Sequence, residues 1–168
     1  GGPVIERAAQ GGDPAYVHFP RGMEHARNRT TDNGLDIETC FSFSGLKTAL
    51  LYHLKNHPED RERHLADLAA SYQEAVMDSL AQRAERALKA TGARTLACVG
   101  GVAKNALLRG RLEDLARRRQ ARLLLTPLAY CTDNAAMVAA AAGLRALAGI
   151  GNPPAVEADP SLPLVEEA

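Results

Sequence analysis

Four neighbouring residues with polar or ligating side chains separate an apolar run from an alanine-rich segment: Cys131, Thr132, Asp133 and Asn134. A carboxylate such as that of Asp133 is an oxygen ligand that divalent cations accept. The alternative is structural, because Thr, Asp and Asn are all favoured helix N-caps. The local sequence favours a cap at Thr132 or Asp133, and a metal ligand at Asp133 is the second interpretation.

A glycine pair, Gly100 and Gly101, ends another apolar run and is followed by Asn105. Without Cβ atoms the backbone can approach a ligand closely. A helix that starts here would offer free N–H groups and its positive end to a phosphate. Asn105, which we expect one turn inside that helix, could bind a ribose or another polar ligand. Tight packing is an equally good explanation for the glycines.

Two histidines, His53 and His57, have the i, i+4 spacing that lets a helix face hold one metal ion. No Glu stands between them, Pro58 follows at once, and no further ligand is near in the sequence. We therefore interpret the pair as a solvated helix end.

Basic residues gather between Arg109 and Arg122, and another lies in "FSFSGLK". They could contact the phosphates of a nucleic acid, which requires several cations together. Glu113 and Asp114 could instead compensate an ordinary solvated face. The candidate contacts are Lys47, Arg117, Arg118, Arg119 and Arg122.

Periodicity predicts the elements that position these residues. We expect strands at 40–44, 93–101 and 121–127, and helices after Ser44, over 60–90, over 103–119 and over 133–148. Ser44 is the expected cap of its helix, Pro58 the end of it, and Gly92 the stop of the next. Alternating strands and helices indicate an α/β protein with a parallel sheet, whose ligands bind beyond the carboxyl ends of the strands. Residues 27–36 read as an exposed loop.

Composition narrows the class of protein. The chain of 168 residues is 46% hydrophobic, carries no formal net charge and has 4% aromatic residues. Any nucleic-acid contact must then use a local patch, and a stacking platform for single strands is not expected. Cys40, Cys98 and Cys131 form no CxxC pair, and no membrane-spanning or signal segment is visible, which indicates a reduced, cytoplasmic protein. We expect one domain over 1–150 and a flexible Pro-rich acidic tail over 151–168.

The order of several motifs resembles the TsaD/Gcp family, the tRNA N6-adenosine threonylcarbamoyltransferases once called O-sialoglycoprotein endopeptidases. The motifs are "GGP" (1–3), "FPRGM" (19–23), "FSFSGLKTAL" (41–50), "LADLAASYQEAVMDSL" (65–80), "GGVAKNALLRGRL" (100–112) and "CTDNAAMVAAAAGL" (131–144). The resemblance covers residues 1–149.

The resemblance implies an actin-like ATPase fold, that of sugar kinases and heat-shock ATPases, of which this chain is the second lobe with a mixed or parallel sheet flanked by helices. It implies transfer of a threonylcarbamoyl group from threonylcarbamoyl-AMP to N6 of the adenosine beside the tRNA anticodon. Asp133 would ligate one divalent metal, iron or zinc, and the cleft would hold threonylcarbamoyl-AMP or ATP. Asn105 would contact the nucleotide-like substrate and Gly2 would line the same cleft. The glycine pair Gly100 and Gly101, noted above, is the other candidate contact to the substrate.

The implied partners are tRNA, the first lobe of the same protein, and TsaB- and TsaE-like proteins. The family's metal-binding histidines and its "SGGH" segment belong to the first lobe and are not in this sequence. We therefore expect the 168-residue chain to be inactive alone. His53 and His57 stand at another place in the motif order.

Three other functions fit parts of the pattern. A metallopeptidase, the old family label, would need a base such as that of an HExxH helix, which is absent. A nucleotide-binding or assembly lobe of an actin-like ATPase needs no transfer chemistry. A carbamoyltransferase acting on another acceptor would share the chemistry.

Overall fold

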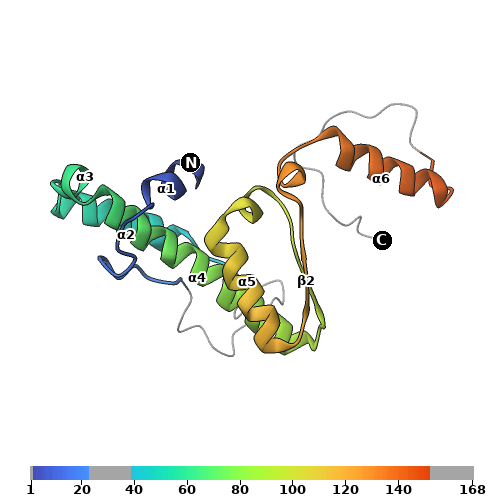
Figure 1. The fold of residues 1–168 in the computed structure, drawn as a ribbon, viewed down its shortest axis with the longest axis horizontal. Coiled ribbons are helices and arrows are strands. Elements are labelled where there is room, and N and C mark those ends of the chain that lie inside the picture. Colours follow the sequence, from blue (N-terminus) through green and yellow to red (C-terminus); the bar gives the residue numbers. More distant parts are fainter. Residues whose placement is uncertain (1, 23–38, 152–168) are drawn as a thin grey trace. The chain divides into compact units, whose positions relative to one another are not determined.

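The computed structural model describes residues 2–22 and 39–151, in two units divided between Thr132 and Asp133 (Figure 1). The second unit contributes one described helix, α6 (Ala135–Leu147). The first unit contains, in chain order, α1 (Gly2–Ala8), α2 (Ser44–Asn56), α3 (Asp60–Arg63), α4 (Leu65–Thr91), β1 (Thr95–Cys98), the 3-10 helix η2 (Gly101–Lys104), α5 (Ala106–Arg119), β2 (Arg122–Leu125) and the 3-10 helix η3 (Leu128–Tyr130).

Helix α4 is the central element of the first unit, because α1, α2, α3 and α5 all contact it. Its apolar residues recur at helical spacing, and Leu68, Ala69 and Leu88 are buried. Leu65 differs, with 53% of its surface exposed at the start of the helix. Gly92 ends α4 in the left-handed conformation at φ 66°, as predicted, and its N–H donates to the carbonyl of Leu88.

The strands β1 and β2 pair in parallel, with Thr95 opposite Arg122 and Cys98 opposite Leu125. This confirms the predicted α/β class with a parallel sheet, although the described sheet has only these two strands. Helix α5 lies between α4 and the strands (Figure 1), and one core cluster joins the three layers. Its buried members are Met77, Leu88, Leu108, Leu112 and Leu115, with Leu96, Cys98 and Leu123 of the strands packed against them. Both strands therefore end at the same edge of the unit.

The predicted strand at 40–44 is wrong. Residues 40–43 have no regular structure, and Ser44 is the first residue of α2 rather than its cap. The alternation that suggested a strand instead places Phe41 and Phe43 in a stacked pair, with ring centroids 6.1 Å apart. An alternating pattern makes a strand only where another strand is available to pair with it.

One helix was missed, and two other predicted helices need smaller corrections. Helix α1 was not predicted, although Pro3 is compatible with the first turn of a helix. The helix predicted over 60–90 is interrupted at His64, whose φ of −129° separates α3 from α4. Helix α5 begins at Ala106 and not at Ala103, because η2 occupies the preceding residues. The predicted loop at 27–36 and nearly all of the predicted tail lie outside the described residues.

None of the described helices combines the length and the apolar character needed to cross a membrane. Cys40, Cys98 and Cys131, all within the described residues, form no disulfide bond. Helix α6 is apolar and has no buried residue; Met137, Val138, Leu144 and Leu147 are among its exposed side chains.

Candidate functional site

The segments that follow β1 and β2 are held together at the carboxyl ends of the strands. The backbone N–H and the hydroxyl of Thr126 both donate to the carbonyl of Cys98, each at 3.2 Å. This places the segment after Gly100 beside the segment after Pro127, where ligands of open α/β sheets bind.

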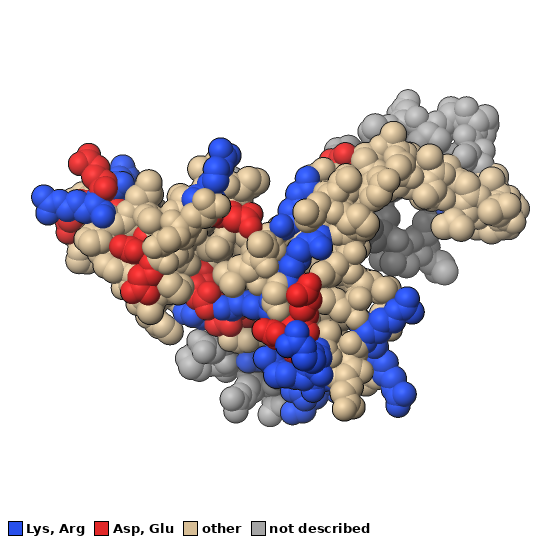
Figure 2. Space-filling model, in the orientation of Figure 1, with Lys and Arg blue, Asp and Glu red and all other residues tan. Residues whose placement is uncertain are grey.

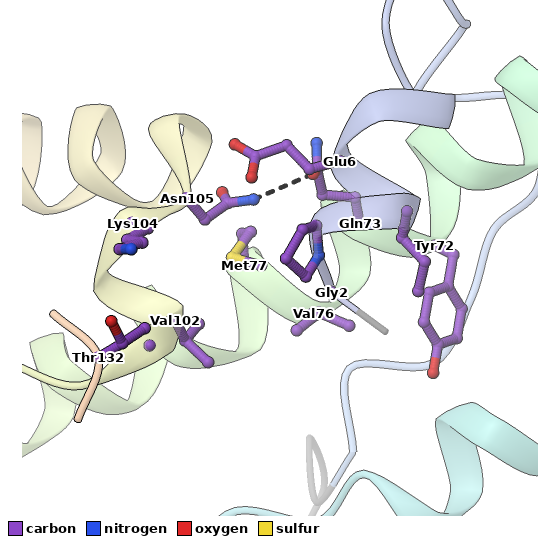
Figure 3. A pocket seen from close by; sticks show the side chains of 13 residues that line it. Gly2, Glu6, Tyr72, Gln73, Val76, Met77, Val102, Lys104, Asn105 and Thr132 are labelled. Carbon is purple, nitrogen blue, oxygen red and sulfur yellow. Dashed lines mark hydrogen bonds between the residues drawn. The ribbon is translucent and has the colours of Figure 1, made fainter. Parts of the chain in front are cut away.

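A cavity of about 490 Å³ opens beside these segments, between α1, α4 and η2 (Figure 3). Three residues predicted from the sequence line it together: Gly2, Gly101 and Asn105. Gly100 precedes the lining and is not part of it. The other lining residues are Pro3, Ile5, Glu6, Tyr72, Gln73, Val76, Met77, Val102, Lys104 and Thr132. The cavity is thus mostly apolar with a few polar groups, the usual character of a small-molecule site.

Asn105 is the polar residue that the fold holds most firmly in this lining. It is 7% exposed, and its Nδ2 donates to Oε1 of Gln73 on α4 at 3.0 Å (Figure 3). Its Oδ1 accepts the N–H of Leu108 at 3.0 Å, so Asn105 is the N-cap of α5 rather than a residue one turn inside it. The amide of Asn105 has a second N–H, which these two hydrogen bonds do not use.

The N-terminus of α5 was predicted to offer free N–H groups to a phosphate. Two of these groups already have partners, because Leu108 donates to Asn105 and Ala106 donates to Oε1 of Glu6 at 3.0 Å. Glu6 reaches this position from α1 and also lines the cavity. A phosphate at the end of α5 would therefore compete with a carboxylate of the protein itself.

Gly100 has a backbone conformation that favours glycine. Its φ of 85° with ψ of 176° belongs to a region that side chains with a Cβ rarely adopt. The chain turns here from β1 into η2, and the turn brings Gly101 and Val102 to the cavity. The need for a glycine at position 100 is thus conformational.

Arg109 joins the two strand-end segments. Its Nε donates to the carbonyl of Ala103 at 2.6 Å, and its Nη2 donates to the carbonyl of Thr126 and lies 3.6 Å from Sγ of Cys131. The buried thiol of Cys131 is also 3.5 Å from the carbonyls of Thr126 and Pro127. Arg109 therefore belongs to the site and not to the surface cluster with which it was grouped by sequence.

Cys98 ends β1 next to these contacts, and burial raises the pKa of its thiol despite the nearby Arg109. A thiol with a raised pKa stays protonated at neutral pH and is a poor nucleophile. Cys98 thus packs against the core cluster as an apolar side chain.

Asp133 and Asn134 belong to the second unit, whereas Cys131 and Thr132 end the first. The N-cap of α6 is Asn134, whose Oδ1 accepts the N–H of Met137 at 2.9 Å. The expected cap at Thr132 or Asp133 is therefore wrong, and the exposed Asp133 has no capping role. Within the described residues no group of three or more His, Cys, Asp and Glu side chains could hold a metal ion. A metal bound by Asp133 would need ligands from outside them.

His53 and His57 are structural residues of the first unit. Nε2 of His53 lies 2.6 Å from Oδ2 of Asp60, a carboxylate that is 3% exposed. The other oxygen of Asp60 accepts the hydroxyl of Tyr16 at 3.0 Å. His57 stacks on His53 with ring centroids 4.8 Å apart and is itself half exposed. The solvated interpretation thus holds for His57 and is wrong for His53, which pairs with a buried acid.

The predicted cation cluster lies on the surface near the C-terminal end of α5, with acids beside it (Figure 2). Arg117 pairs with Asp114 at 3.0 Å, and Arg119 pairs with Glu85 at 2.7 Å. Arg118 and Arg122 are exposed, and so is Lys47 on α2. These contacts neutralise part of the cluster without testing any role toward nucleic acid.

The site also contains residues that the sequence did not single out, chiefly Glu6 and Gln73. Glu6 follows Gly2 by four residues, so a correct prediction of α1 would have placed both on one face. Gln73 carries no local signal, because only the packing of α4 against η2 brings it to Asn105.

Comparisons with known proteins agree on one family. The family model described as "TsaD: tRNA N6-adenosine threonylcarbamoyltransferase" matches residues 1–140. Curated relatives of that same name are 44% identical in Salinibacter ruber, 42% in Kosmotoga olearia and 43% in Thermotoga neapolitana. The matches cover 98%, 98% and 96% of this chain and 47%, 46% and 46% of the respective relatives. The chain thus spans about half the length of the curated relatives it matches.

Proposed function

The chain belongs to the TsaD family of tRNA N6-adenosine threonylcarbamoyltransferases, and we propose that it carries the nucleotide side of such an enzyme's active site. The whole enzyme transfers the threonylcarbamoyl group of threonylcarbamoyl-AMP to N6 of the adenosine next to the anticodon of tRNA. The observation that supports this proposal is that Gly2 and Asn105, which the family resemblance assigns to the substrate cleft, line one cavity together with Gly101 of the glycine pair.

In this proposal the cavity binds the adenylate part of the donor. Val76, Met77 and Val102 offer apolar surface of the kind that a nucleobase covers, while Asn105 and Glu6 offer a donor and an acceptor at its edge. The N6 amine forms the new bond to the carbamoyl carbon and gives up a proton, while the bond from that carbon to the phosphate oxygen breaks and AMP leaves. Holding donor and acceptor in line is what the residues of this chain contribute to the rate.

A metal ion is expected from the family resemblance, with Asp133 as one ligand. The described residues provide this one exposed carboxylate and no group of three ligands, so they do not fit a complete metal site. We assign no step of the reaction to a metal.

The proposal extends to the setting of the enzyme. The chain would be the second lobe of an actin-like fold, acting in the cytoplasm with the first lobe, with tRNA and with TsaB- and TsaE-like proteins. The apolar, fully exposed helix α6 and the two-stranded sheet agree with a unit that packs against further structure.

The test is a cavity-blocking variant of the complete enzyme. A Cβ at Gly101 would meet no heavy atom within 4 Å, so Gly101→Val should fold and place its methyl groups at the cavity wall. We expect KM for threonylcarbamoyl-AMP to rise at least about tenfold, equivalent to about 1.4 kcal/mol of lost binding. The measurement is the initial rate of N6-threonylcarbamoyladenosine formation in unmodified tRNA as threonylcarbamoyl-AMP is titrated.

Gly110→Val is the matched control, because Gly110 lies on α5 outside the cavity lining and also has space for a Cβ. Its KM should equal that of the wild type. The proposed function is wrong if the complete wild-type enzyme forms no modified adenosine from threonylcarbamoyl-AMP, and the assignment of the cavity is wrong if both variants behave alike.

A further inference from the structure

The outward side of α2, together with Phe41 just before the helix, forms a surface that is not part of the cavity lining. We call this surface the α2 face; its members are Phe41, Lys47, Leu51, Tyr52 and Lys55. The segment from Cys40 to His57 contains no acidic residue. An anionic partner that binds this segment therefore meets its lysines without competition from a carboxylate of the same segment.

The inward side of α2 fixes the helix. Leu46 is 1% exposed, and Ala49, Leu50 and Leu54 pack against the same core cluster as Phe19 and Leu68. Lys47, Leu51 and Lys55 follow one another at intervals of four residues and therefore form a stripe on the opposite side. The positions of the two cations are thus set by the core beneath them.

Two aromatic rings flank this stripe. Phe41 is 52% exposed and stacks on Phe43 with an interplanar angle of 9°, while Phe43 packs against the core. Tyr52 is 58% exposed, and the ammonium group of Lys55 lies 5.7 Å from its ring centroid. Each ring keeps accessible surface. The low aromatic content of the chain argued against a stacking platform, yet two of its few rings are exposed on this one segment.

The arginine cluster of α5 differs in its charge balance. Arg117 and Arg119 already pair with Asp114 and Glu85, so a phosphate would have to displace these carboxylates. The ion pairs formed among the described residues include neither Lys47 nor Lys55. Arg118 and Arg122 are also outside these ion pairs, but residues 106–125 include no aromatic side chain. Of the two surfaces, the α2 face is thus the one that combines such cations with exposed rings.

Unpaired RNA is the partner that matches this combination. Proteins bind single-stranded RNA by contacting its phosphates with cations and stacking its splayed bases on aromatic rings. We propose that the α2 face docks the unpaired nucleotides of the tRNA anticodon loop, with Lys47 and Lys55 on the phosphates and with Phe41 and Tyr52 against bases. This inference rests on the proposed function, since that function supplies tRNA as the partner.

The experiment measures binding of unmodified tRNA to the complete enzyme by fluorescence anisotropy over a series of salt concentrations. Lys47→Gln with Lys55→Gln should weaken binding and lower the log–log salt slope by about 0.7 for each lost phosphate contact. Phe41→Ala with Tyr52→Ala should weaken binding about tenfold for each lost stack and leave the slope unchanged. Arg117→Gln with Arg119→Gln removes the same charge from α5 and should change both quantities less than the lysine pair.

Circular dichroism and the KM for threonylcarbamoyl-AMP check that the α2 variants fold and keep the cavity. The inference is overturned if both α2 variants bind tRNA with wild-type affinity and slope, or if they lose only the binding of a partner protein. Such a result leaves the proposed function intact when the wild-type enzyme still modifies tRNA. Failure of the wild type to bind or modify tRNA overturns both.

Discussion

At the scale of single residues, the sequence suggested two roles for the polar residues before α6, a helix N-cap and a metal ligand. Asn134 caps α6 through the N–H of Met137, and Asp133 has no part in that cap. Capping therefore does not explain the carboxylate of Asp133. A substitution at Asp133 can test a metal-ligand role without disturbing the cap.

Asp133→Asn should leave the stability of the complete enzyme within about 0.5 kcal/mol of wild type, because it replaces an exposed carboxylate outside the cap by an amide of the same shape. If Asp133 ligates metal, metal content and transfer rate fall together in this variant. Asn134→Ala is the comparison, and it should cost about 1 kcal/mol of stability by removing the cap. Metal content by mass spectrometry and urea unfolding are the measurements. Full metal occupancy and normal transfer in Asp133→Asn would contradict a metal role.

Asp60 provides a second residue-scale prediction, on pH. Its hydrogen bond to His53 and, less, that to Tyr16 hold the pKa of this buried carboxyl below its ordinary 3.8, although burial opposes the shift. A carboxyl whose pKa is lowered by folding stabilises the protein above its unfolded pKa, and that contribution is lost as pH falls through the folded pKa. Asp67 acts in the same direction, chiefly through the backbone N–H of Asp13.

The first unit should therefore lose stability as the pH falls below about 4, where these carboxyls take up protons. Asp60→Asn should lower the urea midpoint at pH 7 and make the decline toward acid shallower. Asp114→Asn, which removes an exposed carboxylate of α5, is the control and should keep the wild-type pH profile. Parallel profiles for wild type and Asp60→Asn would show that this network does not control acid stability.

At the scale of elements, α5 connects the two segments that carry the candidate site. Its N-cap Asn105 faces the cavity, and Arg109 one turn later binds the carbonyls of Ala103 and Thr126. The guanidinium has several donors in a fixed plane, which a single ammonium group cannot replace. We interpret Arg109 as a positioning residue.

Arg109→Lys in the complete enzyme should cost about 1–3 kcal/mol of stability, since it breaks charge-assisted hydrogen bonds to backbone carbonyls. KM for threonylcarbamoyl-AMP should rise more than kcat falls, because the variant loosens the cavity wall without removing a group that touches the reacting atoms. Hydrogen exchange should accelerate at the amides of residues 101–105 and 126–131. Arg117→Lys, at an exposed position of the same helix, is the control. Unchanged exchange in Arg109→Lys would contradict the positioning role.

The elements with a clear apolar pattern in the sequence could be predicted. The elements that depend on contacts with distant parts of the chain could not. Helices α4 and α5 and both strands follow from apolar periodicity and from Gly92. The segment at 40–44 alternates like a strand, but no described strand pairs with it. Helix α1 is only seven residues long and starts in a Gly- and Pro-rich stretch, so its pattern is too short to read. Asn105 was found through the motif, whereas its cap geometry depends on η2, which periodicity does not reveal.

The same division holds for the site. Gly2, Gly101 and Asn105 share a cavity, although Gly2 precedes the other two by about a hundred residues in sequence. Glu6 and Gln73 complete the cavity through contacts between α1, α4 and α5, which no local pattern encodes. His53 illustrates the reverse case, because its spacing from His57 suggested a metal while its actual partner, Asp60, lies seven residues away.

At the scale of the whole molecule, the described residues leave much apolar surface exposed. The outward positions of the strands, among them Ala97 and Leu124, are exposed, and so is every residue of α6 but for its cap. A two-stranded sheet is rarely stable by itself, and an apolar helix is usually covered. These features predict that further structure covers this apolar surface.

The final prediction is that the 168-residue chain does not transfer the threonylcarbamoyl group when supplied alone. It contains the cavity that we propose for the adenylate, its described residues include no group of three metal ligands, and it spans 47% of the Salinibacter ruber relative. Mixed with unmodified tRNA, threonylcarbamoyl-AMP and divalent iron or zinc, it should give no N6-threonylcarbamoyladenosine by nucleoside mass spectrometry. The complete enzyme under the same conditions is the positive control, and its Gly101→Val variant reports the effect of the cavity alone. Formation of the modified nucleoside by the isolated chain, at a rate within about tenfold of the complete enzyme, would show that these residues contain the whole catalytic site.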